Sequence, residues 1–337
     1  MLSEIIKKLI RQEDLSPTEA NHAMTAIMTG NAGEACTASI LTALAIKGET
    51  GPEVEAFARA MRHAALNWPG DQSEDVCDTC GTGGDGASSI NISTLAALTL
   101  AALGLKVAKH GNRAVSSTTG SADLLEALGY PMNAPPEETV HILNRSGMCF
   151  LFAPAWHPAM KYAAPVRKSL GIRTVFNILG PLTNPAPISY QVVGVFGRTY
   201  LKQMAHALAG LRRKGAYVIH AEDGLDEVSP GSPTHFIRIA DGNVAEEGQL
   251  TPEDFGFVTQ SAAALRINDR DEGVRRVRAI LAGQGSDLEK QTVAMNAALV
   301  LSMVRNQDLK SAAEECLTVL NTDKPLAVME QWTTASL

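Results

Sequence analysis

The chain has 337 residues, of which 45% are hydrophobic and 19% charged, and its formal net charge is -7. This length and composition predict a globular protein with a substantial core and exclude a disordered chain. The acidic balance argues against binding to nucleic acid or to acidic membranes, and no apolar run reaches the ~18 residues of a membrane helix, so we expect a cytoplasmic protein without membrane contact.

Residues 1–66 carry the signals of helices and little else. Two segments, Ser16 to Glu19 and Thr50 to Glu53, combine a capping hydroxyl, a proline in the first turn and a glutamate that can reach back. This combination marks a helix start, because the hydroxyl and the carboxylate satisfy free backbone amides. We therefore predict a small helical domain over residues 1–66.

After residue 66 the pattern changes to short apolar runs, each followed by a glycine-bearing turn and a helical stretch. Strands that alternate with helices predict a mostly parallel central sheet with ligands at the carboxyl ends of its strands, and hence an α/β domain over residues 67–337. Part of residues 155–185 is a candidate to pack with the helical domain. The predicted strands are Val76 to Thr79, Lys106 to Ala108, Met148 to Phe152, Tyr190 to Phe196 and Ala216 to His220.

The later part of the chain predicts a hairpin around Asp241-Gly242-Asn243, within residues 234–249, and amphipathic helices over residues 269–320. The five cysteines form an odd, scattered set, which is typical of a reducing compartment. Cys77 and Cys80 form a C-x-x-C pair, but no second pair follows to complete a zinc site. We interpret both as buried strand residues.

A glycine-rich loop, Gly81-Thr82-Gly83-Gly84-Asp85-Gly86, follows the first predicted strand and precedes a helix that begins near Asn91. Such a loop presents backbone amides to an anion. A dinucleotide site would need an acidic residue about 20 positions later, where this chain has Lys106 and Lys109, and a nucleotide P-loop would need a closing Gly-Lys-Ser/Thr. We predict a phosphate-binding loop; a tight turn without a ligand is the alternative.

A second polar segment, Lys109 to Arg113, lies at the end of the second predicted strand and is followed by Ser116, Ser117 and Ser121. The lysine ammonium is a point charge suited to phosphate, and the hydroxyls and glycine amides add neutral donors around it. We predict a phosphate cup, with a solvated basic turn as the alternative.

An adjacent pair of acids, Asp226 and Glu227, comes shortly after the predicted strand that ends at His220. Mg²⁺ takes a few carboxylates and completes its shell with waters and substrate phosphate oxygens. The pair is therefore a candidate metal site, although an acid pair in a loop is more often only solvated.

Four groups of motifs resemble the anthranilate phosphoribosyltransferase family in order, spacing and residue identity, over nearly the whole chain. They are GTGGDG with NIST, KHGNRAVSS with GSADLLEALG, HPAMKYAAPVRKSLGIRTVFNILGPLTNPA, and DGLDEVS. The resemblance implies a small helical domain against a larger α/β domain, a fold shared with the pyrimidine nucleoside phosphorylases. It also implies a homodimer.

The resemblance implies contacts to phosphoribosyl pyrophosphate from the glycine-rich loop, the helix start behind it and the Lys109 segment. The implied residues are Gly81, Gly84, Asp85, Ser89, Asn91, Ile92, Ser93, Thr94, Lys109, His110, Gly111, Asn112, Arg113, Ala114, Val115, Ser116, Ser117 and Ser121. Ser89 stands where the family commonly has threonine and keeps the hydroxyl. Because the charge of Asp85 would repel phosphate, we expect it to face a ribose hydroxyl, a magnesium-bound water or the incoming amine.

Two further sets of residues follow from the resemblance. The Mg²⁺ ligands are expected to be Ser93, Asp226 and Glu227, and the anthranilate site to include Gly81, Asn112 and Arg167. A guanidinium grips a carboxylate with two parallel hydrogen bonds, which suits an aromatic acid. His110 and His157 fit a structural role as well as a ligand role, and residues 180–185 fit either a rigid turn or a wall of the acceptor pocket.

The resemblance implies transfer of a phosphoribosyl group from phosphoribosyl pyrophosphate to the amine of anthranilate, in tryptophan biosynthesis. Catalysis would be mainly electrostatic, through Lys109 and Mg²⁺. A pyrimidine nucleoside phosphorylase is the nearest alternative, but it has no use for Asp226, Glu227 or Arg167 in these roles. A non-catalytic relative that binds nucleic acid is a second alternative, and the intact Lys109 segment and the acidic charge argue against it.

Overall fold

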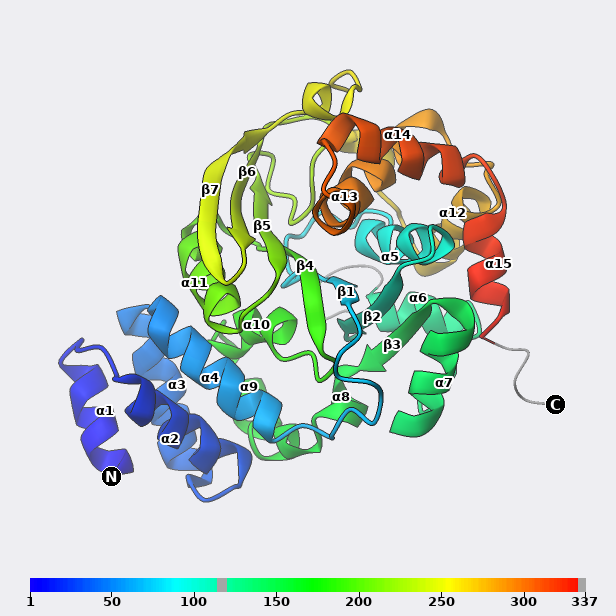
Figure 1. Cartoon of the computed structure of the whole chain (residues 1–337). Helices are drawn as coiled ribbons and strands as arrows, with labels where there is room; N and C mark the ends of the chain where they lie inside the picture. The colour runs from blue at the N-terminus through cyan, green and yellow to red at the C-terminus, as the bar shows by residue number, and fades with distance from the viewer. Residues whose placement is uncertain (114–119, 333–337) are drawn as a thin grey trace.

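The amino-terminal helices lie at one end of a sheet in this computed structural model, which describes residues 1–113 and 120–332 (Figure 1). These helices are α1 (Leu2–Ile10), α2 (Pro17–Met28), α3 (Gly33–Lys47) and α4 (Gly51–His63). The predicted capping boxes are confirmed at the starts of α2 and α4, where Glu19 and Glu53 reach back to the cap residues Ser16 and Thr50.

The sheet has seven strands in the order β3-β2-β1-β4-β5-β6-β7. The five from β3 to β5 are parallel, whereas β6 and β7 add an antiparallel hairpin that turns at Asp241 and Gly242. The predicted α/β class and the predicted hairpin are both confirmed. The strands are β1 (Val76–Thr79), β2 (Lys106–Gly111), β3 (Met148–Phe152), β4 (Ile188–Gly194), β5 (Gly215–Ala221), β6 (Thr234–Ala240) and β7 (Asn243–Leu250).

Two of the predicted strands, β2 and β4, have boundaries that are wrong by two or three residues. Strand β2 does not end at Ala108 but continues to Gly111, because its backbone stays paired with β3 as far as the Gly111–Phe152 register. Strand β4 begins two residues earlier than predicted and ends at Gly194 rather than Phe196. The apolar pattern alone misplaced the carboxyl end of β2 because polar side chains lie within that strand. It misplaced the carboxyl end of β4 because another loop approaches closely at Gly194.

Helices cover both faces of the sheet, and each face has its own core. Along β5 the buried side chains alternate: Tyr217 and Ile219 belong to the core with α5 (Ile92–Ala102) and α13 (Asp287–Arg305), and Ala216 and Val218 to the core with α11 (Leu201–Gly210). This period of two is expected of a strand covered on both sides. The second core continues into α1–α4, so it joins the amino-terminal helices to the sheet.

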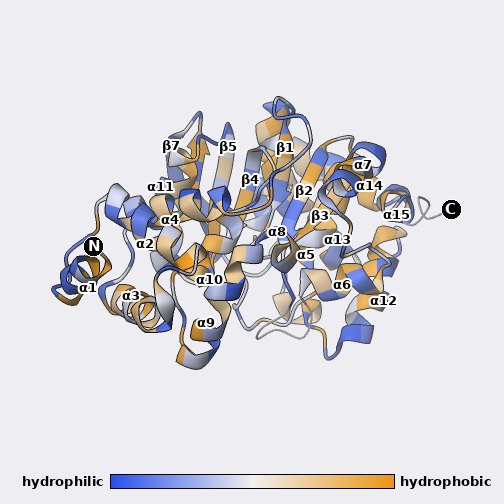
Figure 2. Cartoon of the chain, turned by 90° about the horizontal axis from the view of Figure 1, so that it is seen from below, coloured by the Kyte–Doolittle hydropathy of each residue, from blue (hydrophilic) through white to orange (hydrophobic). Residues whose placement is uncertain are grey.

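Helices α1–α4 lie at one end of the molecule, and α12 and α15 lie toward the other end (Figure 2). Helices α9 and α10 contact α3 and α4 respectively. The remaining α-helices are α6 (Ser121–Ala127), α7 (Pro136–Ser146), α8 (Ala153–Trp156), α9 (Ala164–Leu170), α10 (Phe176–Leu179), α12 (Arg270–Leu281), α14 (Leu309–Leu320) and α15 (Lys324–Glu330).

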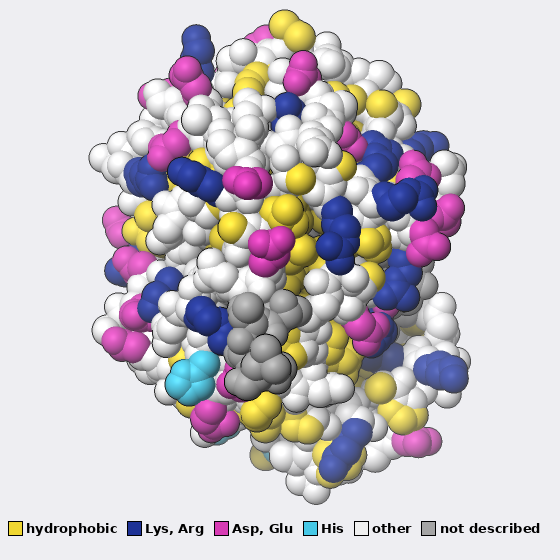
Figure 3. Space-filling model, turned by 90° about the vertical axis from the view of Figure 1, so that its right-hand side faces the viewer, with side chains coloured by type: hydrophobic (Ala, Val, Ile, Leu, Met, Phe, Trp, Pro, Cys, Tyr) yellow, Lys and Arg dark blue, Asp and Glu magenta, His cyan; other side chains and the backbone are white. Residues whose placement is uncertain are grey.

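Surface charge is mixed on the face shown in Figure 3, where acidic and basic side chains are interspersed. Within the described residues, no helix has both the length and the apolar character needed to cross a membrane. Cys77 lies in β1, as predicted, whereas Cys80 lies directly after the strand rather than in it. Both cysteines are buried and free.

Candidate active site

Predicted site residues from the glycine-rich loop, the start of α5, β2 and the acidic loop lie together where the strand order reverses, between β1 and β4. At such a switch point the loops after neighbouring parallel strands separate and leave a crevice. Gly81 follows β1, Gly194 ends β4, and Asp226 lies against both of them. A Cβ on Gly81 would come 2.4 Å from Asp226 Oδ2, and one on Gly194 would come 1.5 Å from the Asp226 carbonyl oxygen. The two glycines therefore allow the acidic loop to approach the strand ends.

The glycine-rich loop has a backbone that few other residues could adopt. Gly83, Gly84 and Gly86 have φ angles of 65°, 78° and 74°, in the left-handed region. The Gly83 amide donates to Asp226 Oδ2 at 3.0 Å, and Asp85 Oδ1 accepts from the Ala87 amide at 3.1 Å. Two carboxylates thus hold the backbone of the loop in this conformation, with its turns already formed.

The segment behind the loop is anchored at its other end. Ser89 forms an isolated bridge with Arg266, and the Ile90 amide donates to the Leu265 carbonyl at 2.9 Å. Helix α5 then begins at Ile92, after the cap residue Asn91. Its second residue, Ser93, donates its backbone amide to Glu227 Oε1 at 3.1 Å. A carboxylate at a helix amino terminus is favourable, because that end carries partial positive charge.

Lys109 is the buried cation of the site. Only 2% of the residue is exposed, and its ammonium donates to the Thr79 carbonyl and to Ser93 Oγ. Its burial follows from its place in the interior of β2, and its ammonium crosses to the end of β1. The structure therefore brings together three predicted residues, Lys109, Ser93 and Glu227, that lie far apart in the sequence.

The acids Asp226 and Glu227 lie close to each other and to Asp85. Burial raises the pKa of both carboxyl groups, and neighbouring negative charge raises it further: Asp85 acts on Asp226, and Asp226 acts on Glu227. Among residues 1–113 and 120–332, no three His, Cys, Asp or Glu side chains are arranged to hold a metal ion by themselves. The donor set of two crowded carboxylates and the Ser93 hydroxyl fits Mg²⁺, which commonly completes its shell with water and phosphate oxygens.

After Lys109, Asn112 and Arg113 are both exposed but have different partners. Asn112 is exposed, and its carbonyl accepts from the Ala122 amide at 3.2 Å and from Ser121 Oγ at 3.4 Å. Arg113 points to helix α6, where it pairs with Asp123 at 3.0 Å and with Glu126 at 2.7 Å. The predicted contacts Ala114, Val115, Ser116 and Ser117 lie outside the described residues.

Arg167, on α9, is half-buried and has no ion pair with any described residue. Its guanidinium lies 5.2 Å from the centre of the Phe176 ring, and burial lowers its pKa. The pKa shift reflects a partly dehydrated cation without a counter-ion, which suits an incoming carboxylate.

Two buried histidines lie beside each other, with ring centres 5.1 Å apart. His110 Nδ1 is 3.0 Å from the Gly180 carbonyl, and the Nε2 atoms of His110 and His157 have no hydrogen-bond partner among the described residues. Burial lowers both pKa values, that of His157 to about 3, so both rings are neutral near pH 7.

Comparison with known proteins places this geometry in a family. A family model described as the helical bundle domain of a glycosyl transferase family matches residues 3–65, and the model of its a/b domain matches residues 73–325. Anthranilate phosphoribosyltransferase from Rubrobacter xylanophilus is 44% identical over 88% of this chain and 86% of its own. The enzyme of that name from Aeropyrum pernix is 40% identical over 99% of this chain and 96% of its own. The chain belongs to the anthranilate phosphoribosyltransferase family.

Solved structures of anthranilate phosphoribosyltransferases have the same fold. The crystal structure from Thermus thermophilus aligns with a TM-score of 0.90 at 40% identity, covering 98% of each chain. The Saccharomyces cerevisiae enzyme in complex with PRPP and Mg aligns with a TM-score of 0.89 at 26% identity, covering 99% of this chain and 97% of its own. The resemblance predicted from the sequence strings is confirmed.

The structure also identifies residues that the sequence did not single out. Arg173 donates to the Gly84 carbonyl at 2.8 Å, and its guanidinium stacks 4.0 Å from the centre of the Phe196 ring. It thereby links the chain segment after Arg167 to the glycine-rich loop of this anthranilate phosphoribosyltransferase family member. Gly194 was also missed, because a single glycine at a strand end gives no signal until the Asp226 loop is known to cross it.

Proposed function

We propose that this chain transfers the phosphoribosyl group of phosphoribosyl pyrophosphate to the amine of anthranilate, giving N-(5-phosphoribosyl)anthranilate and pyrophosphate in tryptophan biosynthesis. The observation that carries the proposal is the meeting of the glycine-rich loop, Lys109 and the pair Asp226 and Glu227 at the β1–β4 switch point. Identity of 40–44% to enzymes of that name over most of the chain supports the same reaction.

The donor would lie across the glycine-rich loop and the start of α5. Loop amides and the Lys109 ammonium then face the pyrophosphate, which gains negative charge as its bond to the ribose carbon breaks. Ser93, Asp226 and Glu227 would hold Mg²⁺, which when bound neutralises part of the charge on the phosphate oxygens. The Saccharomyces cerevisiae relative was solved with PRPP and Mg, which supports this assignment.

The acceptor would lie on the Arg167 side of the crevice, with Gly81 and Asn112 near it. Arg167 offers two parallel donors to the anthranilate carboxylate, which leaves the amine directed to the sugar. No strong base is required, since the amine has a free lone pair and can lose its proton after the bond forms. Displacement from the face opposite pyrophosphate predicts inversion at the sugar carbon. The Saccharomyces cerevisiae relative in complex with 4-fluoroanthranilate supports an aromatic acid as acceptor.

The active protein is proposed to be a homodimer, because that is the usual state implied by the family resemblance. The decisive assay is the loss of anthranilate fluorescence in the presence of phosphoribosyl pyrophosphate and Mg²⁺, with thymidine phosphorolysis measured in parallel. Anthranilate consumption without thymidine cleavage is expected. Cleavage of thymidine with no consumption of anthranilate by well-folded protein would assign the chain to the nucleoside phosphorylases instead.

A further inference from the structure

Arg173 reaches the glycine-rich loop from outside the set of predicted site residues. It lies between α9 and α10, and its guanidinium donates to the Gly84 carbonyl at 2.8 Å. The residue is exposed and forms no ion pair with any described residue. Its position therefore depends on the bond to Gly84 and on the ring of Phe196, and neither contact neutralises its charge.

The Phe196 ring forms a platform for this guanidinium. The guanidinium carbon lies 4.0 Å above the ring centre, and the ring also contacts Tyr200 edge-on, with 4.8 Å between the ring centres. The Phe196 amide donates to Thr82 Oγ1 at 3.0 Å, so the platform is itself attached to the glycine-rich loop. Because a planar guanidinium donates within its own plane, stacking on the ring sets the direction of its bond to Gly84.

Other bonds that hold the loop come from the carboxyl end of the sheet. The Thr82 amide donates to the Gly194 carbonyl at 2.8 Å, where β4 ends. The Gly83 amide donates to Asp226 Oδ2, in the loop after β5. Arg173 instead belongs to a segment that packs on the amino-terminal helices, since α9 contacts α3 and α10 contacts α4. Its bond therefore joins the glycine-rich loop to the helical end of the molecule.

The bond to Arg173 fixes the orientation of one peptide unit in the loop. A trans peptide is planar, so its carbonyl and its amide point in opposite directions. With the Gly84 carbonyl turned toward Arg173, the Asp85 amide points to the other side. The amides of Gly84, Asp85 and Gly86 donate no hydrogen bond to any described residue, so they remain available to an anion.

We propose that Arg173 is a positioning residue for the phosphoribosyl donor: it keeps the Gly84 carbonyl turned away from the phosphates and the Asp85 amide directed toward them. This inference rests on the proposed function, which places the phosphoribosyl donor on the glycine-rich loop. A carbonyl oxygen carries partial negative charge, so a flipped peptide unit would replace an amide that binds phosphate by a group that repels it. Arg173 acts through the loop backbone and does not itself contact the phosphates.

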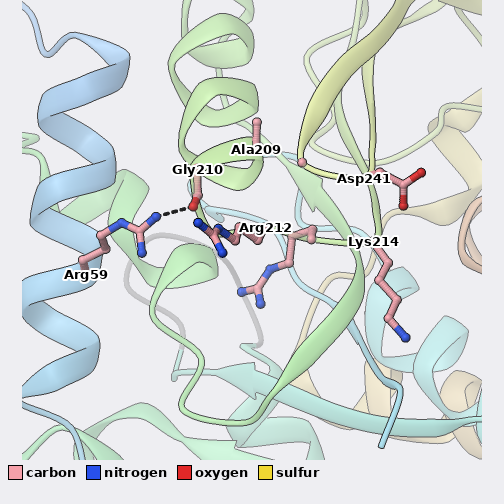
Figure 4. A pocket seen from close by; sticks show the side chains of 8 residues that line it. Arg59, Ala209, Gly210, Arg212, Lys214 and Asp241 are labelled. Atoms are coloured by element: carbon pink, nitrogen blue, oxygen red, sulfur yellow. Dashed lines mark hydrogen bonds between the residues drawn. The ribbon is translucent and has the colours of Figure 1, made fainter. Parts of the chain in front are cut away.

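The test compares three variants of the full chain with the parent chain. Arg173→Ala removes the bond and the stacking, whereas Arg173→Lys keeps a cation that can donate to a carbonyl but has no planar face. Arg59→Ala is the matched control, because Arg59 is also exposed and donates to a glycine carbonyl, that of Gly210 (Figure 4). Gly210 ends α11 and precedes β5, whereas the glycine-rich loop follows β1.

Three measurements are made on each protein. Hydrogen–deuterium exchange without ligand reports the glycine-rich loop, calorimetry reports the affinity for phosphoribosyl pyrophosphate with Mg²⁺, and steady-state kinetics report the KM of each substrate. In ligand-free Arg173→Ala we expect faster exchange within this loop. The change should appear at the amides of Thr82, Gly83 and Ala87, which are hydrogen-bonded in the parent chain.

Arg173→Ala should also weaken binding of phosphoribosyl pyrophosphate, and raise its KM, at least about fivefold, the scale of an exposed charge-assisted hydrogen bond. The KM for anthranilate should change far less. Arg173→Lys should recover part of the loss, and Arg59→Ala should match the parent chain. A change in the KM for anthranilate alone would assign Arg173 to the acceptor and overturn the proposal.

Exchange in Arg173→Ala that equals that of the parent chain would also overturn the proposal, even with weaker phosphoribosyl pyrophosphate binding, because the arginine would then contact the phosphates directly. Equal affinities in Arg173→Ala and Arg59→Ala would do the same. A parent chain that does not bind phosphoribosyl pyrophosphate would refute the proposed function and this assignment with it. The two failures are therefore distinguishable.

Discussion

Arg167 and Arg173 lie on one chain segment, but their surroundings assign them different roles. Arg173 is committed to the glycine-rich loop through the Gly84 carbonyl and to the Phe196 ring. The Arg167 guanidinium contacts only the face of the Phe176 ring among the described interactions, so its donors stay available. No described residue supplies a counter-ion for Arg167, and the acceptor carboxylate is the partner that the proposed reaction supplies.

Substitution of Arg167 is expected to act on the acceptor. Arg167→Ala should raise the KM for anthranilate at least ~10-fold, equivalent to roughly 1.4 kcal/mol, and change the KM for the donor far less. Arg167→Lys should recover little, because an ammonium lacks the planar pair of donors. Steady-state kinetics with each substrate varied will check this, with the exposed neighbour changed as Lys168→Ala for control. An effect mainly on the donor KM would place Arg167 in the phosphate site.

Replacing the acids of the site should abolish magnesium-dependent activity without lowering the stability of the fold. Asp226→Asn with Glu227→Gln removes one buried and one half-buried carboxylate that repel each other and Asp85. We expect the double variant to lose magnesium-dependent activity, while its melting temperature in EDTA equals or exceeds that of the parent chain. Calorimetry in EDTA and activity titrated with Mg²⁺ measure the two effects. A variant that keeps its magnesium dependence would remove these acids from the metal site.

At the scale of elements, the capping boxes of α2 and α4 have the same chemistry but different burial. Glu19 stays partly exposed at the start of α2, whereas Glu53 is fully buried and accepts from the Leu15 amide, the Thr50 amide and the Lys47 ammonium. Glu53 thereby ties α4 to the loop before α2 as well as capping its own helix. An unpaired buried group costs more than a lost exposed one, so the two boxes should contribute unequally.

The two capping glutamates offer a matched comparison. Glu53→Ala should reduce the free energy of unfolding by roughly 3 kcal/mol, because it leaves the Leu15 amide and the buried Lys47 side chain without this partner. Glu19→Ala should cost at most about 1 kcal/mol, since its site is open to water. Urea unfolding of both variants gives the two values. Equal losses would show that burial does not set the contribution of Glu53.

The carboxyl ends of β1 and β4 need glycine because a side chain at Gly81 or Gly194 would collide with Asp226. In Gly194→Ala the new methyl group would meet the Asp226 backbone, so the acidic loop has to move away from the strand end. A displacement of about 1 Å at a reacting centre can cost ~100-fold in rate, and we expect a loss of that order in kcat/KM. Gly197→Ala is the control, because its nearest contacts are ordinary ones of 3.4 Å or more. Comparable activity of Gly194→Ala and the parent chain would contradict this packing argument.

At the scale of the whole molecule, the sheet separates two cores that are anchored to different helices. One core contains α5, α13 and α14, and the other contains α11 with the amino-terminal helices. The predicted division of the chain between residues 66 and 67 stays a prediction, since the second core runs across it.

The proposed homodimer can be measured directly. Sedimentation velocity at micromolar protein should give a mass twice the 35.7 kDa of one chain. A dilution series then reports the dissociation constant, and activity measured across the same series shows whether the dimer is required. A single species of one-chain mass at all concentrations would contradict the expectation.

Local signals in the sequence were sufficient where the chain's near neighbours decide the structure. The capping boxes at Ser16 and Thr50, the hairpin turn at Asp241 and the left-handed glycine-rich loop each depend on a few consecutive residues. The polar residues of β2 were harder to predict. Lys109 looked like a loop residue because its charge breaks the apolar pattern, and only pairing with β3 keeps it within the strand.

The sequence by itself determined the alternation of strands and helices, the glycine-rich loop, and the family to which these motifs belong. Only the tertiary structure decided which of these motifs meet. The reversal of strand order between β1 and β4 brings Glu227 to Ser93 and Asp226 to Gly83, across more than a hundred residues. Such contacts depend on the order in which helical crossovers place the parallel strands. No local sequence pattern specifies that order.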